Sequence, residues 1–211
     1  MLLLAFVAAF PPLLAFLIVW FGDKTPTLTH YLTVLALPVL QLAVPFPALF
    51  LGVAVLGEEI DGRTITYLFT RPLPRAVHYL GRLFGFVLAY GLVLGLGVCG
   101  VAWAFGASIG LTTQQVLGSV GIAAGGLLVY AAFFALLRAL IRRALFVGFL
   151  ITFITEVAIS KMPVSGLSQC SIWHHLALLE LRLHGQTTLR FAAFRGIAAS
   201  ETTTGSLIVL G

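Results

Sequence analysis

The chain has 211 residues, of which 60% are hydrophobic and only 9% are charged. Soluble domains carry about 25% charged residues, so this composition excludes a soluble globular enzyme. The mean hydropathy of +1.10 extends over the whole chain, which predicts a polytopic, all-α bundle of transmembrane helices. The net charge of +5 does not indicate a nucleic-acid partner, because most arginines flank apolar segments and act as topology signals in a lipid bilayer.

The first apolar segment, residues 2–21, lacks the basic start and the cleavage site of a signal peptide, so we expect a transmembrane helix there. Further spans are expected at 31–56, 77–105, 116–137 and 144–159. Pro38, Pro45 and Pro47 should kink the second of these. The run 206–211 is too short for a hydrocarbon core of ~30 Å. The sequence therefore predicts one transmembrane domain over 1–211, with five complete spans and the start of a sixth.

The basic residues predict the orientation of the bundle, because loops on the cytoplasmic side carry the excess of Lys and Arg. Seven of the twelve lie between the second and third spans or between the fourth and fifth: Arg63, Arg71, Arg75, Arg82, Arg138, Arg142 and Arg143. We therefore expect a cytoplasmic N-terminus and an extracytoplasmic segment at 160–205.

Glycines also recur four residues apart within the apolar segments, a spacing that lets helices pack closely. We expect these pairs to serve packing: Gly81 with Gly85, Gly91 with Gly95, Gly106 with Gly110, and Gly121 with Gly125.

The most informative segment is 57–76, in which three acids precede three arginines. Glu58, Glu59 and Asp61 would favour the positive N-terminus of a short helix, and Arg71 its negative end. Pro72 would end that helix, and an apolar flank recurs at near-helical spacing, with members Ile60, Thr64, Tyr67, Leu68 and Phe69. Two interpretations remain open: an interfacial loop held by its arginines, or a helix that docks a soluble partner.

The string GEEIDGRTITYLFTRPLPR, followed after three residues by YLGRL, resembles the first cytoplasmic loop of type-2 ATP-binding-cassette (ABC) transporter permeases. The resemblance is to the branch that includes the copper-enzyme maturation permeases. The matching positions are Glu58 or Glu59, Gly62, Arg63, Thr64, Pro72, Arg75, Gly81 and Arg82. In that family this loop is the coupling element that docks on the ATPase subunit.

The resemblance implies a multi-pass permease subunit of an ABC exporter in the plasma membrane, which pairs with an ATPase subunit and with a second permease, identical or different. It implies that the partner-binding residues are Glu58, Glu59, Asp61, Gly62, Arg63, Thr64 and Tyr67, with Arg71 and Arg75 holding the loop to lipid head groups or to the partner. Such permeases usually begin with a basic cytoplasmic helix and complete a sixth span. This chain opens at Met1-Leu2-Leu3 and stops at Gly211, which predicts a fragment or an atypical subunit.

The energy source is expected on another chain. A phosphate-binding loop would read GxxxxGK[ST], and neither Lys24 nor Lys161 follows such a glycine pattern. We therefore expect no catalytic residue and no cofactor in this chain, with ATP and Mg²⁺ bound by the partner ATPase.

Two polar residues within the spans are candidates for a translocation path. Glu156 lies in the fifth span, where burying a carboxylate is costly. Because it is four residues from the end of its span, it either simply reaches the interface or contributes to the path. Gln41 in the second span is a weaker candidate, and a hydrogen bond across helices is the better expectation for it.

A metal site at Cys170, His174 and His175 is disfavoured, because adjacent histidines on a helix point about 100° apart and no further ligands cluster there. We expect instead an interfacial helix, with an inward face of Ile172, Trp173, Leu176, Leu179 and Leu183 and a surface of His174, His175 and Arg182.

Two alternatives to a transporter remain. A membrane-embedded enzyme would need a nucleophile beside a base, and Ser119 has no histidine in its own span. The second alternative is a scaffold subunit that binds a partner without transporting anything.

Overall fold

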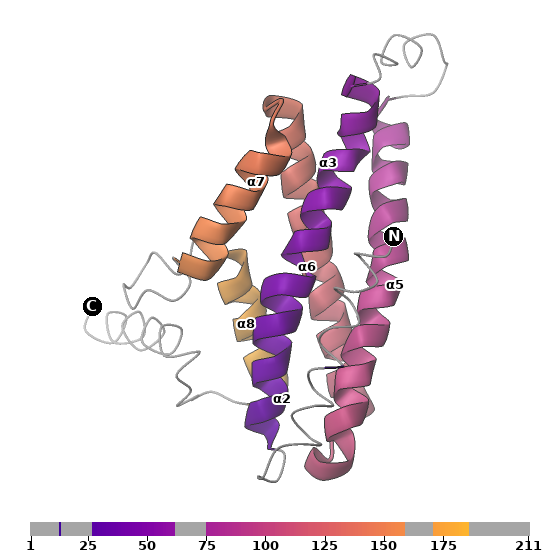
Figure 1. Ribbon diagram of the computed structural model, residues 1–211. Helices are drawn as coiled ribbons and strands as arrows, with labels where there is room; N and C mark the ends of the chain where they lie inside the picture. The colour runs from indigo at the N-terminus through magenta and orange to yellow at the C-terminus, as the bar shows by residue number, and fades with distance from the viewer. Residues whose placement is uncertain (1–12, 14–26, 62–74, 159–170, 186–211) are drawn as a thin grey trace, which may run out of the picture.

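The computed structural model describes residues 13, 27–61, 75–158 and 171–185. Within these residues the chain is helical and has no strand, which confirms the all-α prediction for the part described. The helices pack into an elongated bundle (Figure 1). They are α2 (Leu28–Val34), η1 (Leu35–Ala43), α3 (Pro45–Asp61), α5 (Arg75–Ile109), α6 (Thr113–Leu140), α7 (Ala144–Thr152), η2 (Phe153–Ala158) and α8 (Ile172–Leu183), where η1 and η2 are π-helical.

Three helical stretches are long and apolar enough to cross a bilayer: Leu28–Val55, Tyr79–Gly106 and Thr113–Leu140. They correspond to the spans predicted at 31–56, 77–105 and 116–137, and they indicate a membrane protein. The stretch Ala144–Glu156 is also apolar but is shorter. The spans predicted at 2–21 and 206–211 lie outside the described residues.

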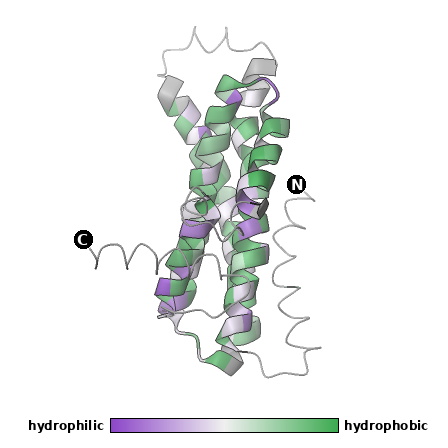
Figure 2. Ribbon diagram, turned by 90° about the vertical axis from the view of Figure 1, so that its left-hand side faces the viewer, coloured by the Kyte–Doolittle hydropathy of each residue, from purple (hydrophilic) through white to green (hydrophobic). Residues whose placement is uncertain are grey.

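The outer surface of the bundle is apolar, as lipid requires. Figure 2 shows hydrophobic residues over most of the length of the helices. Trp103 on α5 is 80% exposed and Phe146 on α7 is 69% exposed. Large apolar side chains of this kind are normally inside a soluble protein, so their position supports a membrane environment.

The first long helix is continuous from α2 to α3 but changes its winding in the middle. Pro38, which has no backbone N–H, lies inside η1, and the N–H of Val44 donates to the carbonyl of Val39, five residues earlier, over 3.0 Å. Pro45 and Pro47 fall in the first turn of α3, where a missing N–H is tolerated. The prolines therefore mark the π-helical segment and the restart of α-helix after it.

The helices α3, α5, α6 and α7 alternate in direction, so the bundle has two distinct ends, and α8 runs antiparallel to α6, as α7 does. At the upper end of Figure 1 lie the end of α3, the start of α5 and the turn from α6 to α7. At the lower end a tight turn joins α5 to α6, and it requires a positive φ of 68° at Gly110. Thr112 then caps α6, its hydroxyl accepting from the N–H of Gln115 over 3.3 Å.

Close packing depends on glycines other than those predicted. A Cβ on Gly52 of α3 would lie 2.5 Å from the carbonyl oxygen of Ala131 on α6, and one on Gly126 would lie 2.6 Å from Leu176 on α8. Most of the predicted pairs do not pack against the described helices, because a Cβ would meet no described atom within 4 Å at Gly81, Gly85, Gly106, Gly110, Gly121 or Gly125. Spacing alone does not reveal which face of a helix meets a neighbour, and here most of these glycines face outward.

Candidate functional site

A buried polar layer lies where the two π-helical segments meet. The side chain of Gln41 on η1 donates from Nε2 to the backbone carbonyl of Glu156 on η2 over 2.5 Å, as expected for a hydrogen bond across helices. Gln41 is the fourteenth of the 28 residues in the span Leu28–Val55, so the contact lies near mid-span. Polar groups at broken helices in mid-membrane are a common feature of transporter binding sites.

The π-helical segments expose backbone carbonyls that side chains from other helices use. The indole Nε1 of Trp173 on α8 donates to the carbonyl of Ala36 over 2.7 Å. The hydroxyl of Tyr90 on α5 donates to the carbonyl of Ala43 over 3.2 Å. These bonds tie η1 to two neighbouring helices without any charged residue on η1.

The carboxylate of Glu156 is buried, with 2% of the residue exposed. Its Oε2 accepts from the hydroxyl of Ser171 over 2.5 Å and from the backbone N–H of Trp173 over 3.1 Å. Ser171 is the N-cap of α8, so the carboxylate lies at the positive end of that helix. Glu156 thus does not reach the interface in this arrangement, and its part in a translocation path stays a prediction.

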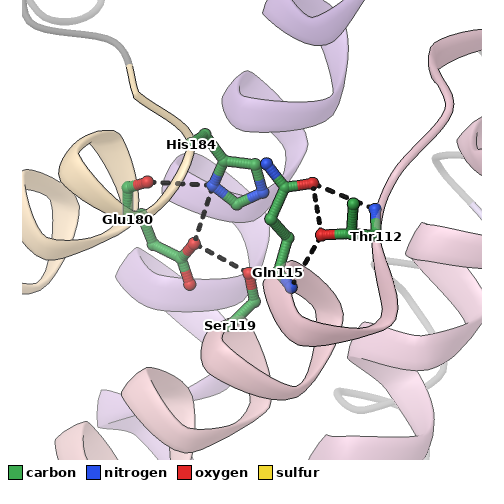
Figure 3. Close-up of polar contacts among 5 residues, drawn as sticks. All are labelled: Thr112, Gln115, Ser119, Glu180 and His184. Atoms are coloured by element: carbon green, nitrogen blue, oxygen red, sulfur yellow. Dashed lines mark hydrogen bonds and ion pairs between the residues drawn. The ribbon is translucent and has the colours of Figure 1, made fainter.

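A second polar cluster joins α8 to α6 near the lower end of the bundle (Figure 3). The hydroxyl of Ser119 donates to Oε2 of Glu180 over 2.8 Å, and both residues are buried. His184 lies one turn beyond Glu180, with its Nδ1 2.9 Å from the backbone carbonyl of Glu180 and 3.7 Å from Oε2. Burial raises the pKa of Glu180 from its ordinary value of 4.5 to about 7, and the Ser119 hydrogen bond opposes that rise.

Tyr31 of α2 closes this cluster from the third side. Its ring meets the imidazole of His184 edge-on, with centroids 5.5 Å apart, and its buried hydroxyl has no hydrogen-bond partner among the described residues. Three helices that are far apart in the sequence therefore meet around one carboxyl group.

Sequence analysis missed this cluster, because it considered histidines only within the span that carries Ser119. The signal that was present is the spacing of Glu180 and His184, which are four residues apart and so share one face of a helix. The sequence did not indicate that this face of α8 packs against α6.

The cluster contains a serine, a histidine and an acid but lacks the geometry of a nucleophilic triad. In such a triad the hydroxyl is activated by the imidazole. Here the hydroxyl of Ser119 donates to the carboxylate, and the imidazole Nδ1 faces the backbone carbonyl of Glu180, so it must be the protonated nitrogen. Ser119 is also fully buried. The arrangement suits proton binding rather than attack on a substrate.

Metal ligation finds no support among the residues that the structure describes, since no three His, Cys, Asp or Glu side chains gather there. The rings of His174 and His175 are nearly perpendicular, at 89°. His184 is held at Nδ1 by a carbonyl, and its Nε2 is buried with no hydrogen-bond partner among the described residues.

The prediction for the face of α8 needs correction. His174 was expected at the surface and is 1% exposed, whereas Leu179 was expected inside and is 50% exposed. The helix was treated as lying on a membrane surface with one apolar face. Instead it packs between α6 and η1, so its buried face is wider and includes polar residues that Glu156 and Ser119 satisfy.

The predicted partner-binding residues lie at the upper end of the bundle or outside the described part of the chain. Glu58, Glu59 and Asp61 were predicted at the N-terminus of a short helix, but they belong to the last turn of α3, which continues to Asp61. Arg75 is the first residue of α5. The others fall in 62–74, outside the described residues: Gly62, Arg63, Thr64, Tyr67 and Arg71.

Arg138 of α6 lies beside the start of this segment. It is buried, its guanidinium Nη1 donates to the carbonyl of Arg142, and a Cβ on Gly57 would lie 3.5 Å from its Nε. Sequence analysis assigned Arg138 only a topological role. The structure adds that this side chain holds the α6–α7 turn and lies beside the end of α3.

Comparison with known proteins gives no family. Nothing matches among family models, curated proteins or solved structures. The functional interpretation therefore rests on the residues themselves.

Proposed function

We propose that the chain is a membrane-spanning permease subunit of an ABC exporter. It would couple ATP hydrolysis by a separate ATPase subunit to movement of a substrate across the plasma membrane. The observation that carries this proposal is the segment 57–76, in which acids, Gly-Arg-Thr and a proline stop follow one apolar span and precede the next. The antiparallel course of α3 and α5, which brings the two ends of this segment to the same end of the bundle, supports it.

In this proposal the bundle has five complete spans and the start of a sixth, with the N-terminus in the cytoplasm. The arginine-rich end supports that orientation, because Arg75, Arg138, Arg142 and Arg143 all belong to it. The segment 57–76 would then face the ATPase, and α8 would lie toward the exit.

ATP-driven closure of the ATPase would push on the segment 57–76 and tilt α3 and α5. Arg138 would pass this motion to α6, since it lies against Gly57 at the end of α3. The polar layer of Gln41 and Glu156 at the two π-helical segments would be the place where the bundle bends. A second permease, identical or different, would complete the path.

Reversing the charge of Arg63 tests the proposal. We expect Arg63→Glu to reduce the ATPase activity that the permease stimulates by about tenfold or more, because a charge pair at a docking surface is replaced by repulsion. The variant should still insert into the membrane. Arg182→Glu is the matched control, since it makes the same change on the exposed face of α8 and should leave the stimulation unchanged.

Unchanged stimulation in Arg63→Glu would refute the coupling role. This experiment does not distinguish a transporter from a scaffold subunit. A second experiment, which cuts the segment 57–76, distinguishes the two. Loss of transport with retained assembly supports a transporter, whereas a scaffold has no transport to lose. An enzyme is disfavoured by the hydrogen bond from Ser119 to a carboxylate rather than to an imidazole.

A further inference from the structure

The contact between α8 and α6 contains an unusual combination of apolar packing and one ionisable pair. Leu183 covers Gly118 and Leu176 covers Gly126, so that a Cβ on either glycine would lie 2.6 Å from a leucine carbon. Ala177 is fully buried between these leucines. Glu180 projects into this same apolar contact, where a lone negative charge is costly.

Among the residues that the structure describes, the groups that face Glu180 do not supply a fixed positive charge to balance it. From α6 it receives the neutral hydroxyl of Ser119. From α2 it meets Tyr31, which is neutral or negative. Within α8 it meets His184. The segment η1, which also packs on α8, has the sequence LALPVLQLA without a titratable side chain. Arg182, two residues on, has its side chain on the exposed face of α8.

We propose that Ser119, Glu180 and His184 form a proton-binding site, which takes up one proton when α8 docks on α6 and η1 and releases it when α8 leaves. The bound proton makes the site electrically neutral, so the apolar contact can close over it. The Ser119 hydroxyl and the Glu180 backbone carbonyl fix the carboxyl group and the imidazole in place. This inference concerns α8 alone and does not depend on an ATPase partner.

The direction of the pH dependence follows from the carboxyl group. Burial raises the pKa of Glu180 from 4.5 to about 7. Protonation of this carboxyl group therefore stabilises the docked state fully below about pH 4.5, and that stabilisation is lost as the pH rises through about 7. Between pH 5.5 and pH 8 the docking equilibrium should fall on the order of tenfold.

Cysteine labelling measures this directly. In a chain with Cys99→Ala and Cys170→Ala, the residue Ala177 is changed to cysteine, whose thiol is covered when α8 is docked. His175→Cys, on the exposed face of the same helix, corrects for the greater reactivity of thiols at high pH. The labelling rate with a maleimide is measured in detergent from pH 5.5 to pH 8 and expressed as the ratio of the two variants.

We expect that ratio to rise on the order of tenfold across this range, and to stay constant when Glu180→Gln is added, because glutamine keeps the acceptor oxygen but cannot titrate. A constant ratio in the parent, or a rise that persists in Glu180→Gln, would overturn the proposal. If Glu180→Gln does not fold, Ser119→Ala decides. The Ser119 hydrogen bond lowers the pKa of Glu180, so its removal should move the midpoint to higher pH, and an unchanged midpoint would contradict the site.

Discussion

Glu156 stabilises the structure by joining two elements that are separate in the sequence. Its carboxylate accepts from the N-cap residue Ser171 and from the backbone of Trp173, while its own carbonyl accepts from Gln41. The first N–H groups of a helix have no carbonyl partner within that helix, so the start of α8 needs such an acceptor. A carboxylate that caps a buried helix is therefore satisfied in a place where a free charge would be costly.

Replacing this carboxylate should destabilise the bundle. We expect Glu156→Leu to lower the free energy of unfolding by about 3 kcal/mol, because the Ser171 hydroxyl and the Trp173 N–H lose their acceptor. Glu156→Gln, which keeps one acceptor oxygen, should lower it by about 1 kcal/mol. Thermal unfolding in detergent measures both, and a leucine variant as stable as the glutamine variant would show that the capping bonds contribute little.

At the scale of elements, α3 and α6 approach closely because Gly52 presents no side chain to Ala131 and Phe134. This contact fixes the distance between two of the long spans. It also brings Gly57 at the end of α3 beside Arg138 at the end of α6. The packing of the two helices thus positions the end of the bundle from which the segment 57–76 leaves.

A methyl group at Gly52 should push these helices apart. Its Cβ would lie 2.5 Å from a backbone carbonyl oxygen that cannot move aside, so we expect Gly52→Ala to cost about 1–3 kcal/mol of stability. Gly121→Ala on α6 is the matched control, because a Cβ there meets no described atom within 4 Å and alanine favours helix by about 1 kcal/mol. Equal effects of the two changes on thermal unfolding would mean that the close approach is not real.

The helices of the structure differ in how well the sequence predicted them. Hydropathy predicted the three long helices to within a few residues, because each must cover a bilayer by itself. Most of the glycine pairs do not pack against the described helices, since their spacing is the same on an outward face as on a packed one. The cluster of Ser119, Glu180 and His184 was missed because it forms only when α8 turns toward α6, and that rotation depends on tertiary packing.

At the scale of the whole molecule, the bundle separates two kinds of polar group. Arg75, Arg138 and Arg143 lie at the end where α5 and α7 start and α6 stops, whereas the buried acids Glu156 and Glu180 lie at the two ends of α8. This separation fits a subunit that receives a push at one end and changes the position of a small helix near the other.

The most direct test of that coupling is co-purification. The chain is tagged, extracted in detergent and scored for an ATPase that purifies with it and for vanadate-sensitive hydrolysis. We predict that an ATPase is recovered, and that it is lost when the order of residues 58–71 is scrambled but kept when the same number of residues is scrambled at 186–199. Recovery of no ATPase, or recovery that does not depend on 58–71, would contradict the account.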